Sequence, residues 1–236
     1  YLGYMRGRYS MEDMKEIDAY ASSLGIEMIP CVQTLAHLNA YFRWLKLPKD
    51  IDDILLVDDE RSYAFIDRLF ATLSKCFASR RIHIGMDEAH NLGRGNFLDR
   101  HGYEKSSSII ARHLGKVKNI AEKYGYHPML WSDMFFRSWN RGQYYIPETL
   151  IPKEIVENFP QNVDPIYWDY YSRDEAHYDA MLKNHAQLPG ETWFAGGLYC
   201  WSGVIPFNAK SLLTMRPAID ACRKNNQRQE EVDTVI

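Results

Sequence analysis

Apolar and polar residues follow two different spacings along the chain, and the spacings predict helices and strands in turn. Apolar residues recur at helical spacing over residues 11–24, 62–77, 106–124, 174–185 and 208–222. Short, largely apolar segments without that spacing fall at residues 26–32, 81–85, 128–131, 166–168 and 193–201. Segments of this kind are typical of strands buried on both faces. The pattern therefore predicts five strands that alternate with amphipathic helices.

The first predicted helix has the clearest boundaries. Ser10 stands at the N-cap position, Asp13 completes a capping box, and Gly25 follows the last turn. One apolar stripe is expected to face inward, formed by Met11, Met14, Ile17, Ala21 and Leu24. Two stretches have weaker signals. The proline-marked connection 137–162 is expected to hold a short helix, and the polar stretch 223–231 is expected to fray.

Strands that alternate with helices predict a parallel sheet covered by helices. Five strands suit a (β/α)8 TIM barrel that lacks about three strands, two before Tyr1 and one after the last residue. An open doubly wound sheet is the alternative, but no G-x-G-x-x-G motif follows a predicted strand. Acidic, aromatic and histidine residues gather after the strands, where a barrel carries its site. We therefore predict one α/β catalytic domain over residues 1–236, an incomplete (β/α)8 barrel.

Composition narrows the classes of function. The chain has 236 residues and 46% hydrophobic residues, enough for a sizeable core. The net charge is −3 without a basic stripe, which argues against nucleic acid as a partner. No apolar run approaches the roughly 20 residues of a membrane span. Because the chain begins at Tyr1 without an initiator methionine or a signal-peptide pattern, we expect a piece of a longer protein.

The four cysteines do not form a metal or redox motif. They lie far apart and no C-x-x-C occurs, so reduced and buried thiols are expected; the residues are Cys31, Cys76, Cys200 and Cys222. Reduced thiols favour a cytoplasmic location slightly over a secreted one. The compartment and the oligomeric state otherwise stay open.

Two adjacent carboxylates end the second predicted strand, in the run Ile82-His83-Ile84-Gly85-Met86-Asp87-Glu88. Like charges disfavour joint ionisation, so a protein that holds two carboxyl groups together often uses one as an acid and one as an anion. Consecutive strand residues point to opposite faces, so both can reach one ligand only if the chain turns there. Gly85 and the following segment Ala89-His90-Asn91-Leu92-Gly93 indicate such a turn. A solvated loop with two surface acids is the alternative.

Aromatic residues end three later strands in succession. Trp131, Trp168 and Trp201 are each followed by small or acidic residues, and together they are expected to wall one pocket. Aromatic faces suit the apolar C–H faces of a pyranose ring. Asp133 and Asp169, next to two of these tryptophans, are candidates for its hydroxyl groups. The pattern therefore indicates a sugar pocket.

At these residues the chain resembles a known family. His83-Ile84-Gly85-Met86-Asp87-Glu88 is similar to the H-x-G-x-D-E signature of family 20 glycoside hydrolases, the exo-β-N-acetylhexosaminidases. The resemblance implies a (β/α)8 barrel that removes terminal β-linked GlcNAc or GalNAc without a cofactor or a metal. It also implies that the 2-acetamido oxygen of the substrate attacks the anomeric carbon. The resulting oxazolinium intermediate is opened by water with retention.

The resemblance assigns roles position by position. Glu88 resembles the general acid/base, and Asp87 resembles the residue that orients the acetamido N–H and stabilises its developing charge. Tyr167 resembles the tyrosine that hydrogen-bonds the acetamido oxygen, with Tyr170 and Tyr171 as adjacent alternatives. The remaining substrate-binding assignments are Asp169 for the outer hydroxyls, Trp131 and Trp201 for the pocket wall, and His37 and His83 near the acid pair.

The chain departs from the family pattern in two places. The family often has Trp-x-Glu near the end of the barrel, whereas Trp201-Ser202 is followed here by Gly203. Selectivity between the C4 epimers GlcNAc and GalNAc is therefore expected to be loose. The arginine with which the family binds sugar belongs to its first strand, which this chain is expected to lack.

Two other functions compete with this hypothesis. A metal-dependent barrel hydrolase would use His83, Asp87, Glu88 and His90 as ligands, but no H-x-H pair lies on an early strand. A glycan-binding barrel without activity would be expected to lose the acid pair, and both acids are present. The glycosidase hypothesis explains the most residues.

Overall fold

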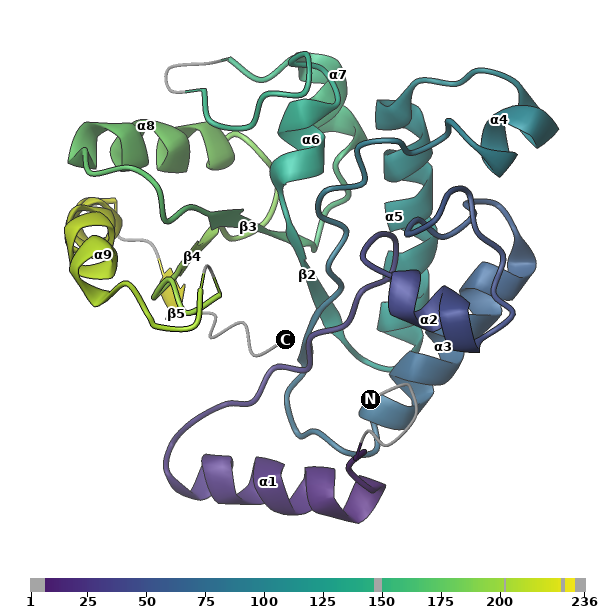
Figure 1. Cartoon of the computed structure of the whole chain (residues 1–236), viewed down its shortest axis with the longest axis horizontal. Coiled ribbons are helices and arrows are strands. Elements are labelled where there is room, and N and C mark those ends of the chain that lie inside the picture. The colour runs from purple at the N-terminus through teal and green to yellow at the C-terminus, as the bar shows by residue number, and fades with distance from the viewer. Residues whose placement is uncertain (1–6, 147–149, 202, 226–227, 232–236) are drawn as a thin grey trace. The chain divides into compact units, whose positions relative to one another are not determined.

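A computed structural model describes residues 7–146, 150–201, 203–225 and 228–231. The chain divides into two units, residues 1–130 and residues 131–236, which we call the N-terminal and C-terminal units. Both units are built from parallel strands and helices that alternate along the chain (Figure 1). Within the described residues, no helix has the length and apolar character that a membrane span requires.

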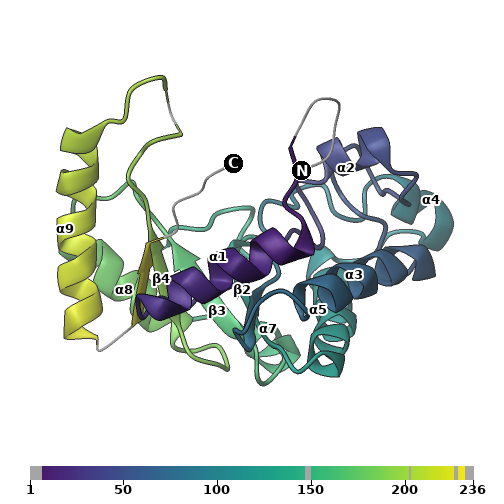
Figure 2. The ribbon, with the colours of Figure 1, turned by 90° about the horizontal axis from the view of Figure 1, so that it is seen from below.

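The N-terminal unit combines two parallel strands with five helices among its described residues. Its elements are α1 (Met11–Ser23), α2 (Asn39–Trp44), α3 (Glu60–Leu73), β1 (Arg81–His83), α4 (Asn96–His101), α5 (Ser106–Lys123) and most of β2 (His127–Trp131). Arg81 lies opposite His127, and His83 lies opposite Met129. Helices α3 and α5 pack side by side (Figure 2). The predicted helices over 62–77 and 106–124 are thus present with slightly different ends.

The core of this unit lies between its helices and strands. The buried side chains of α3 and α5 include Ile66, Phe70, Ile109, Leu114 and Val117, each at most 1% exposed. Full burial of such a side chain contributes roughly 1.5–3 kcal/mol of transfer free energy. These residues belong to the apolar faces that the helical spacing predicts.

Helix α1 confirms its predicted cap but only part of its predicted buried face. The Ser10 side chain accepts from the Asp13 amide, and the Asp13 side chain accepts from the Ser10 amide, which completes the capping box. Asp18 is instead the buried residue of α1, and its Oδ2 accepts from the Ala78 amide at 3.0 Å. Ile17 and Leu24 are 39% and 60% exposed, so the predicted stripe faces inward only in part; Met11, Met14 and Ala21 are half-buried. Asp18 adds a carboxylate contact to this face of the helix.

The first predicted strand, residues 26–32, is shorter than expected. Cys31 forms an isolated parallel bridge with His83. The Val32 amide donates to the His83 carbonyl, and the His83 amide donates to the Pro30 carbonyl, both at 2.9 Å. Pro30 has no amide hydrogen to extend the ladder. The segment therefore follows β1 in parallel but does not form a full strand.

The C-terminal unit has three parallel strands among its described residues. Its elements after the end of β2 are α6 (Asp133–Arg137), α7 (Lys153–Asn158), β3 (Asp164–Trp168), α8 (Glu175–His185), β4 (Trp193–Gly196), α9 (Asn208–Lys224) and β5 (Arg228–Glu231). Strand β4 pairs in parallel with both β3 and β5, and Tyr167 lies opposite Phe194. Helices α8 and α9 pack against each other (Figures 1 and 2).

Three expectations for this unit change. The predicted strand 193–201 ends at Gly196, and Tyr199 beyond it has a φ of 52°, outside the β region. The stretch 223–231 was expected to fray, but it continues α9 and then forms β5, which pairs with β4. Helix α7 confirms the short helix in the connection 137–162, and α6 adds one that the spacing does not reveal.

All four cysteines are free thiols. Cys76 and Cys222 are buried as expected, whereas Cys31 and Cys200 are exposed. The expectation of buried thiols is therefore right for two of the four.

Candidate active site

The chain turns sharply directly after β1. Gly85, Met86 and Glu88 have φ values of 70°, 78° and 52°, in the left-handed region. Non-glycine residues held in sparsely populated backbone regions cost on the order of 1–3 kcal/mol each, and such residues cluster at functional sites. The φ of 70° favours glycine at position 85, and a Cβ there would also overlap the side-chain amide of Gln33. This turn ends the strand before Asp87 and places both carboxylates on a loop.

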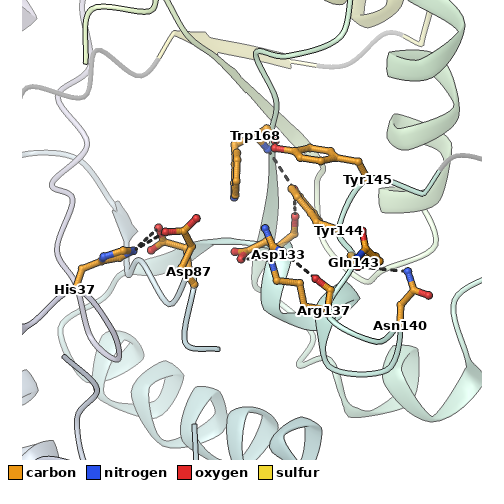
Figure 3. A network of polar contacts seen from close by, with 12 residues as sticks. His37, Asp87, Asp133, Arg137, Asn140, Gln143, Tyr144, Tyr145 and Trp168 are labelled. Atoms are coloured by element: carbon orange, nitrogen blue, oxygen red, sulfur yellow. Dashed lines mark hydrogen bonds and ion pairs between the residues drawn. The ribbon is translucent and has the colours of Figure 1, made fainter. Parts of the chain in front are cut away.

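His37 brings the two carboxylates together. Its Nε2 lies 3.2 Å from Asp87 Oδ2 (Figure 3). The same nitrogen lies 3.6 Å from Glu88 Oε2. The hydrogen bond to Asp87 raises the pKa of His37 to about 8, against a smaller opposing effect of burial. The imidazole is therefore mostly protonated at pH 7. We call Gln33, His37, Asp87 and Glu88 the acid cluster.

The two carboxyl groups of the acid cluster have different surroundings. The Asp87 side chain is 18% exposed and the Glu88 side chain is 42% exposed. Burial raises the pKa of Asp87, but hydrogen bonds from His37 and Gln33 outweigh it, and the net pKa lies below its usual value. Asp87 is thus an anion at neutral pH, while Glu88 reaches solvent. Separate environments of this kind are how two carboxyl groups take different roles.

The loop that carries Gln33 and His37 is fixed to the strand end at Thr34. The Thr34 amide and hydroxyl both donate to the Ile84 carbonyl, at 3.2 and 2.8 Å. On the other side, His113 Nε2 lies 3.0 Å from the Thr34 carbonyl. Burial lowers the pKa of His113 to about 4, so its ring is neutral and donates from Nε2. Helix α5 and strand β1 therefore hold this loop from both sides.

His83 lies close to the acid pair, as the sequence predicted, and it is buried. Its Nδ1 accepts a hydrogen bond from the Gly85 amide at 3.0 Å. Burial lowers the pKa of His83 to about 4, against a smaller effect of Asp87. The neutral ring therefore stabilises the turn that presents Asp87. Sugar contact by His83 stays a prediction.

The tryptophans of the C-terminal unit lie in a group of aromatic rings. The Trp168 ring is stacked on Tyr170 with centroids 5.6 Å apart, and Trp201 lies 4.6 Å from Tyr170 in an edge arrangement. We call the whole group the aromatic cluster: Tyr144, Tyr145, Trp168, Tyr170, Tyr171, Tyr199 and Trp201. It joins two of the three predicted tryptophans. Trp131, the third, is partly exposed at the end of β2.

Trp168 offers a polar group as well as an aromatic face. Its side chain is 8% exposed, and its indole N–H has no hydrogen-bond partner among the described residues. Tyr144 accepts from the Trp168 amide at 3.3 Å, and Tyr145 donates to the Trp168 carbonyl at 3.4 Å (Figure 3). Neither tyrosine was predicted from the sequence, because both lie in the proline-marked connection, which has no periodic pattern of apolar residues.

Tyr167 and Asp169 lie in a buried network of their own. The Tyr167 hydroxyl donates to Asp169 Oδ2 at 2.7 Å, and His177 Nε2 lies 2.9 Å from the same oxygen. The Tyr171 amide donates to Asp169 Oδ1 at 2.8 Å. Tyr167 and Asp169 are 0% and 1% exposed. Their predicted contacts with sugar stay predictions, and the structure gives both residues partners within the protein.

Asp133 also has a hydrogen-bond partner within the protein. It is fully buried, and its Oδ2 accepts from Arg137 Nε at 3.0 Å (Figure 3). Arg137 also donates to the Gly142 carbonyl at 2.9 Å, which fixes the start of the connection that carries Tyr144 and Tyr145. The pair therefore stabilises this part of the aromatic cluster.

The donor set for a metal is weak. Among the residues that the structure describes, no group of three or more His, Cys, Asp or Glu side chains is arranged to hold a metal ion. His90, one of the four ligands considered for a metal-dependent hydrolase, is exposed.

The family model for the catalytic domain of glycosyl hydrolase family 20 matches residues 3–159, about two-thirds of the chain. This chain belongs to that family. The match includes His37, His83, Asp87, Glu88 and Trp131. Tyr167, Asp169 and Trp201 lie beyond it.

Two curated relatives are similar to the chain. Hexosaminidase D of Bos taurus is 25% identical over 196 residues, which are 78% of this chain and 54% of the relative. Hexosaminidase D of Homo sapiens is 25% identical over 200 residues, which are 79% of this chain and 39% of the relative. The chain thus spans about half the length of the first and less of the second.

Solved structures show the fold. The β-N-acetylhexosaminidase from Bacteroides fragilis matches with a TM-score of 0.62 at 18% identity, over 89% of this chain and 41% of that one. The family 20 β-N-acetylhexosaminidase from Streptomyces coelicolor matches with a TM-score of 0.55 at 20% identity, over 82% and 35%. The predicted fold class, an α/β segment of a (β/α)8 barrel, is confirmed.

Proposed function

We propose that this protein is a retaining exo-β-N-acetylhexosaminidase that removes terminal β-linked GlcNAc or GalNAc through an oxazolinium intermediate. Family membership supports hydrolysis of a glycoside. The observation that carries the proposal is the acid cluster, in which His37 lies within 3.6 Å of both carboxylates at the end of β1.

Glu88 is the proposed general acid/base. Its side chain is half-exposed on a left-handed turn, so a leaving group and then a water molecule can reach it. Glu88 protonates the glycosidic oxygen as the bond to the anomeric carbon breaks. It then takes a proton from the water that opens the oxazolinium ring. A positioned acid or base of this kind contributes typically ~10²–10⁴-fold to the rate.

Asp87 is the proposed partner of the acetamido N–H. As the acetamido oxygen attacks the anomeric carbon, positive charge develops on the nitrogen, and an anion close to that N–H stabilises it. The low pKa of Asp87 keeps it ionised at neutral pH, and its hydrogen bonds to His37 and Gln33 fix its orientation. Each carboxylate oxygen can accept more than one hydrogen bond, so these partners do not exclude the substrate.

The aromatic cluster is the proposed source of sugar-binding surface. Its rings offer flat apolar faces to a pyranose, and the buried indole N–H of Trp168 offers a donor to a sugar oxygen. Burial of apolar faces combined with a few fixed polar groups is typical of small-ligand sites. The mechanism needs neither a cofactor nor a metal.

The test compares matched nitrophenyl β-glycosides of GlcNAc, GalNAc and Glc with the full-length protein. If the acetamido group is the nucleophile, the glucoside is nearly inert although it presents the same ring faces. A thiazoline analogue of the cyclic intermediate is expected to bind much more tightly than GlcNAc, because analogues of high-energy states exploit differential binding. Comparable rates for the glucoside and the GlcNAc substrate would refute the substrate-assisted mechanism.

A further inference from the structure

Gln33 connects the backbone of the strand-end turn to the Asp87 carboxylate. Its side-chain carbonyl Oε1 accepts from the Met86 amide at 3.3 Å, and its Nε2 donates to Asp87 Oδ1 at 2.9 Å. The Met86 contact determines which end of the amide faces Asp87, because a backbone N–H can only be met by the carbonyl. The N–H end of the amide is thereby directed at the carboxylate.

We propose that Gln33 is a positioning residue that holds Asp87 in place, as an anion, through an amide whose orientation is locked by the turn. This inference rests on the proposed function, because it assigns Gln33 a part in presenting Asp87 to the acetamido group. No role for this residue follows from the signature itself.

A neutral amide suits this position better than an acid would. It donates to the carboxylate without adding a negative charge beside it, whereas two carboxyl groups in contact share a proton and titrate as a pair. The packing around Gly85 is consistent with the assignment, since a Cβ there would displace the Gln33 amide from this position.

Several titratable groups of the N-terminal unit face Asp87 and influence any pH profile. His37 and Glu88 are the other charged members of the acid cluster. The nearby Cys31 and His83 also interact electrostatically with Asp87. Loss of hydration around the thiol raises the pKa of Cys31 to about 11 although the residue keeps some exposed surface, and burial lowers the pKa of His83 to about 4. Both are therefore neutral between pH 5 and pH 8, where the effect of Gln33 is to be measured.

The first variant is Gln33→Met, which keeps the length of the side chain and removes both hydrogen bonds. Loss of a hydrogen bond to a charged group is expected to misplace Asp87, and kcat on a β-GlcNAc substrate is expected to fall roughly 10- to 100-fold. KM is expected to change less than threefold, because the amide is proposed to act through Asp87 and not on the substrate. The pKa of Asp87, measured by NMR titration of carboxyl-labelled protein, is expected to rise because the carboxylate loses a donor. The Asp87 signal is assigned with Asp87→Asn.

The second variant is Gln33→Glu, which has nearly the same shape. While the Glu and Asp87 share one proton, the new carboxylic acid can still donate to Asp87, and activity is retained. As pH rises through the second ionisation of the pair, the hydrogen bond is replaced by repulsion. Activity at pH 7 is therefore expected to fall at least tenfold and to recover as the pH is lowered toward 5. The descending limb of the pH profile thus moves to lower pH.

The control is Gln161→Glu, which adds the same charge at an exposed position of the C-terminal unit. It should leave the pH profile of activity and the NMR titration of Asp87 unchanged. A new charge that acted only on Glu88 would move the descending limb to higher pH, and that direction would overturn the proposal. An unchanged Asp87 pKa in Gln33→Met would overturn it as well. The NMR titration does not depend on activity, so it separates this proposal from failure of the proposed function, which would appear as an inactive wild-type protein.

Discussion

The acid cluster of the N-terminal unit and the aromatic cluster of the C-terminal unit are held in place by different forces. The acid cluster depends on hydrogen bonds to charged groups and on left-handed backbone at His37, Met86 and Glu88. The aromatic cluster depends on ring contacts at centroid distances of 4.6–6.2 Å, in both edge and stacked arrangements. Directional contacts fix charge and proton position, whereas ring packing creates apolar surface. Under the proposed function, the acid cluster supplies the proton transfer and the aromatic cluster supplies apolar surface for a sugar.

The strongest test of this division is Glu88→Gln, which keeps the shape of the acid and removes its transferable proton. With a natural glycoside, turnover is expected to fall by ~10²-fold or more. With a nitrophenyl glycoside the loss should be smaller, because that leaving group needs no protonation. Steady-state kinetics on both substrates measure the difference, and Glu12→Gln on the exposed side of α1 is the control. Equal losses on both substrates would argue against Glu88 as the acid.

A change in the aromatic cluster should affect binding instead. Trp201→Ala removes a ring that is 37% exposed, and loss of part of its apolar contact is expected to raise KM about tenfold with little change in kcat. Trp44→Ala, at the 51% exposed tryptophan of α2, is the matched control. A fall in kcat with unchanged KM would mean that Trp201 acts on the chemical step and not on substrate binding.

Acid should weaken both units through the same physical effect. His113 in the N-terminal unit and His185 in the C-terminal unit are fully buried, and burial lowers the pKa of each from 6.5 to about 4. The unfolded chain therefore binds more protons, and the stability that each neutral ring contributes above pH 6.5 is lost as pH falls toward 4. Each ring adds about 1.4 kcal/mol per pH unit to the slope in this window.

Urea unfolding at pH 5.5 and pH 4.5 measures that slope. His185→Gln cannot take up a proton on unfolding, so its slope should be smaller than that of the wild type by about 1.4 kcal/mol per pH unit. His113→Gln should give the same reduction from the other unit. An unchanged slope in either variant would mean that the ring is already protonated in the folded chain.

The smallest expected effect concerns the C4 epimers. Because Gly203 stands where the family often has a glutamate, GalNAc is expected to be hydrolysed within roughly tenfold of GlcNAc, a gap of about 1.4 kcal/mol. A Cβ at Gly203 would meet no atom within 4 Å, so Gly203→Glu can be made without a clash. This variant should widen the gap between kcat/KM for the two nitrophenyl substrates. If the wild type already hydrolyses GlcNAc far more efficiently than GalNAc, another residue must distinguish the orientation of the C4 hydroxyl.

Local patterns in the sequence predicted the class of fold correctly, and they located the acidic signature. Helical spacing located α3, α5, α8 and α9 because each buries one face, and the capping box located the start of α1 because its signal is local. The signature around Asp87 and Glu88 could be read because it is contiguous. Gln33 lies directly after the first predicted strand, but the neighbouring sequence does not show which residue its side-chain amide contacts.

Contacts between residues distant in sequence could not be predicted, because they form only when the chain packs. His37 meets Asp87 across 50 positions, His113 holds Thr34 across 79, and Tyr144 reaches Trp168 across 24. The strand at Arg228–Glu231 was missed for the same reason, because pairing with β4 gives a polar segment its strand conformation. Helix α1 shows the opposite case. Its apolar residues have the spacing of a buried face, yet Ile17 and Leu24 are exposed, because spacing alone does not bring another segment against the helix. Local pattern fixes which conformation a segment favours, but only long-range packing decides what that segment contacts.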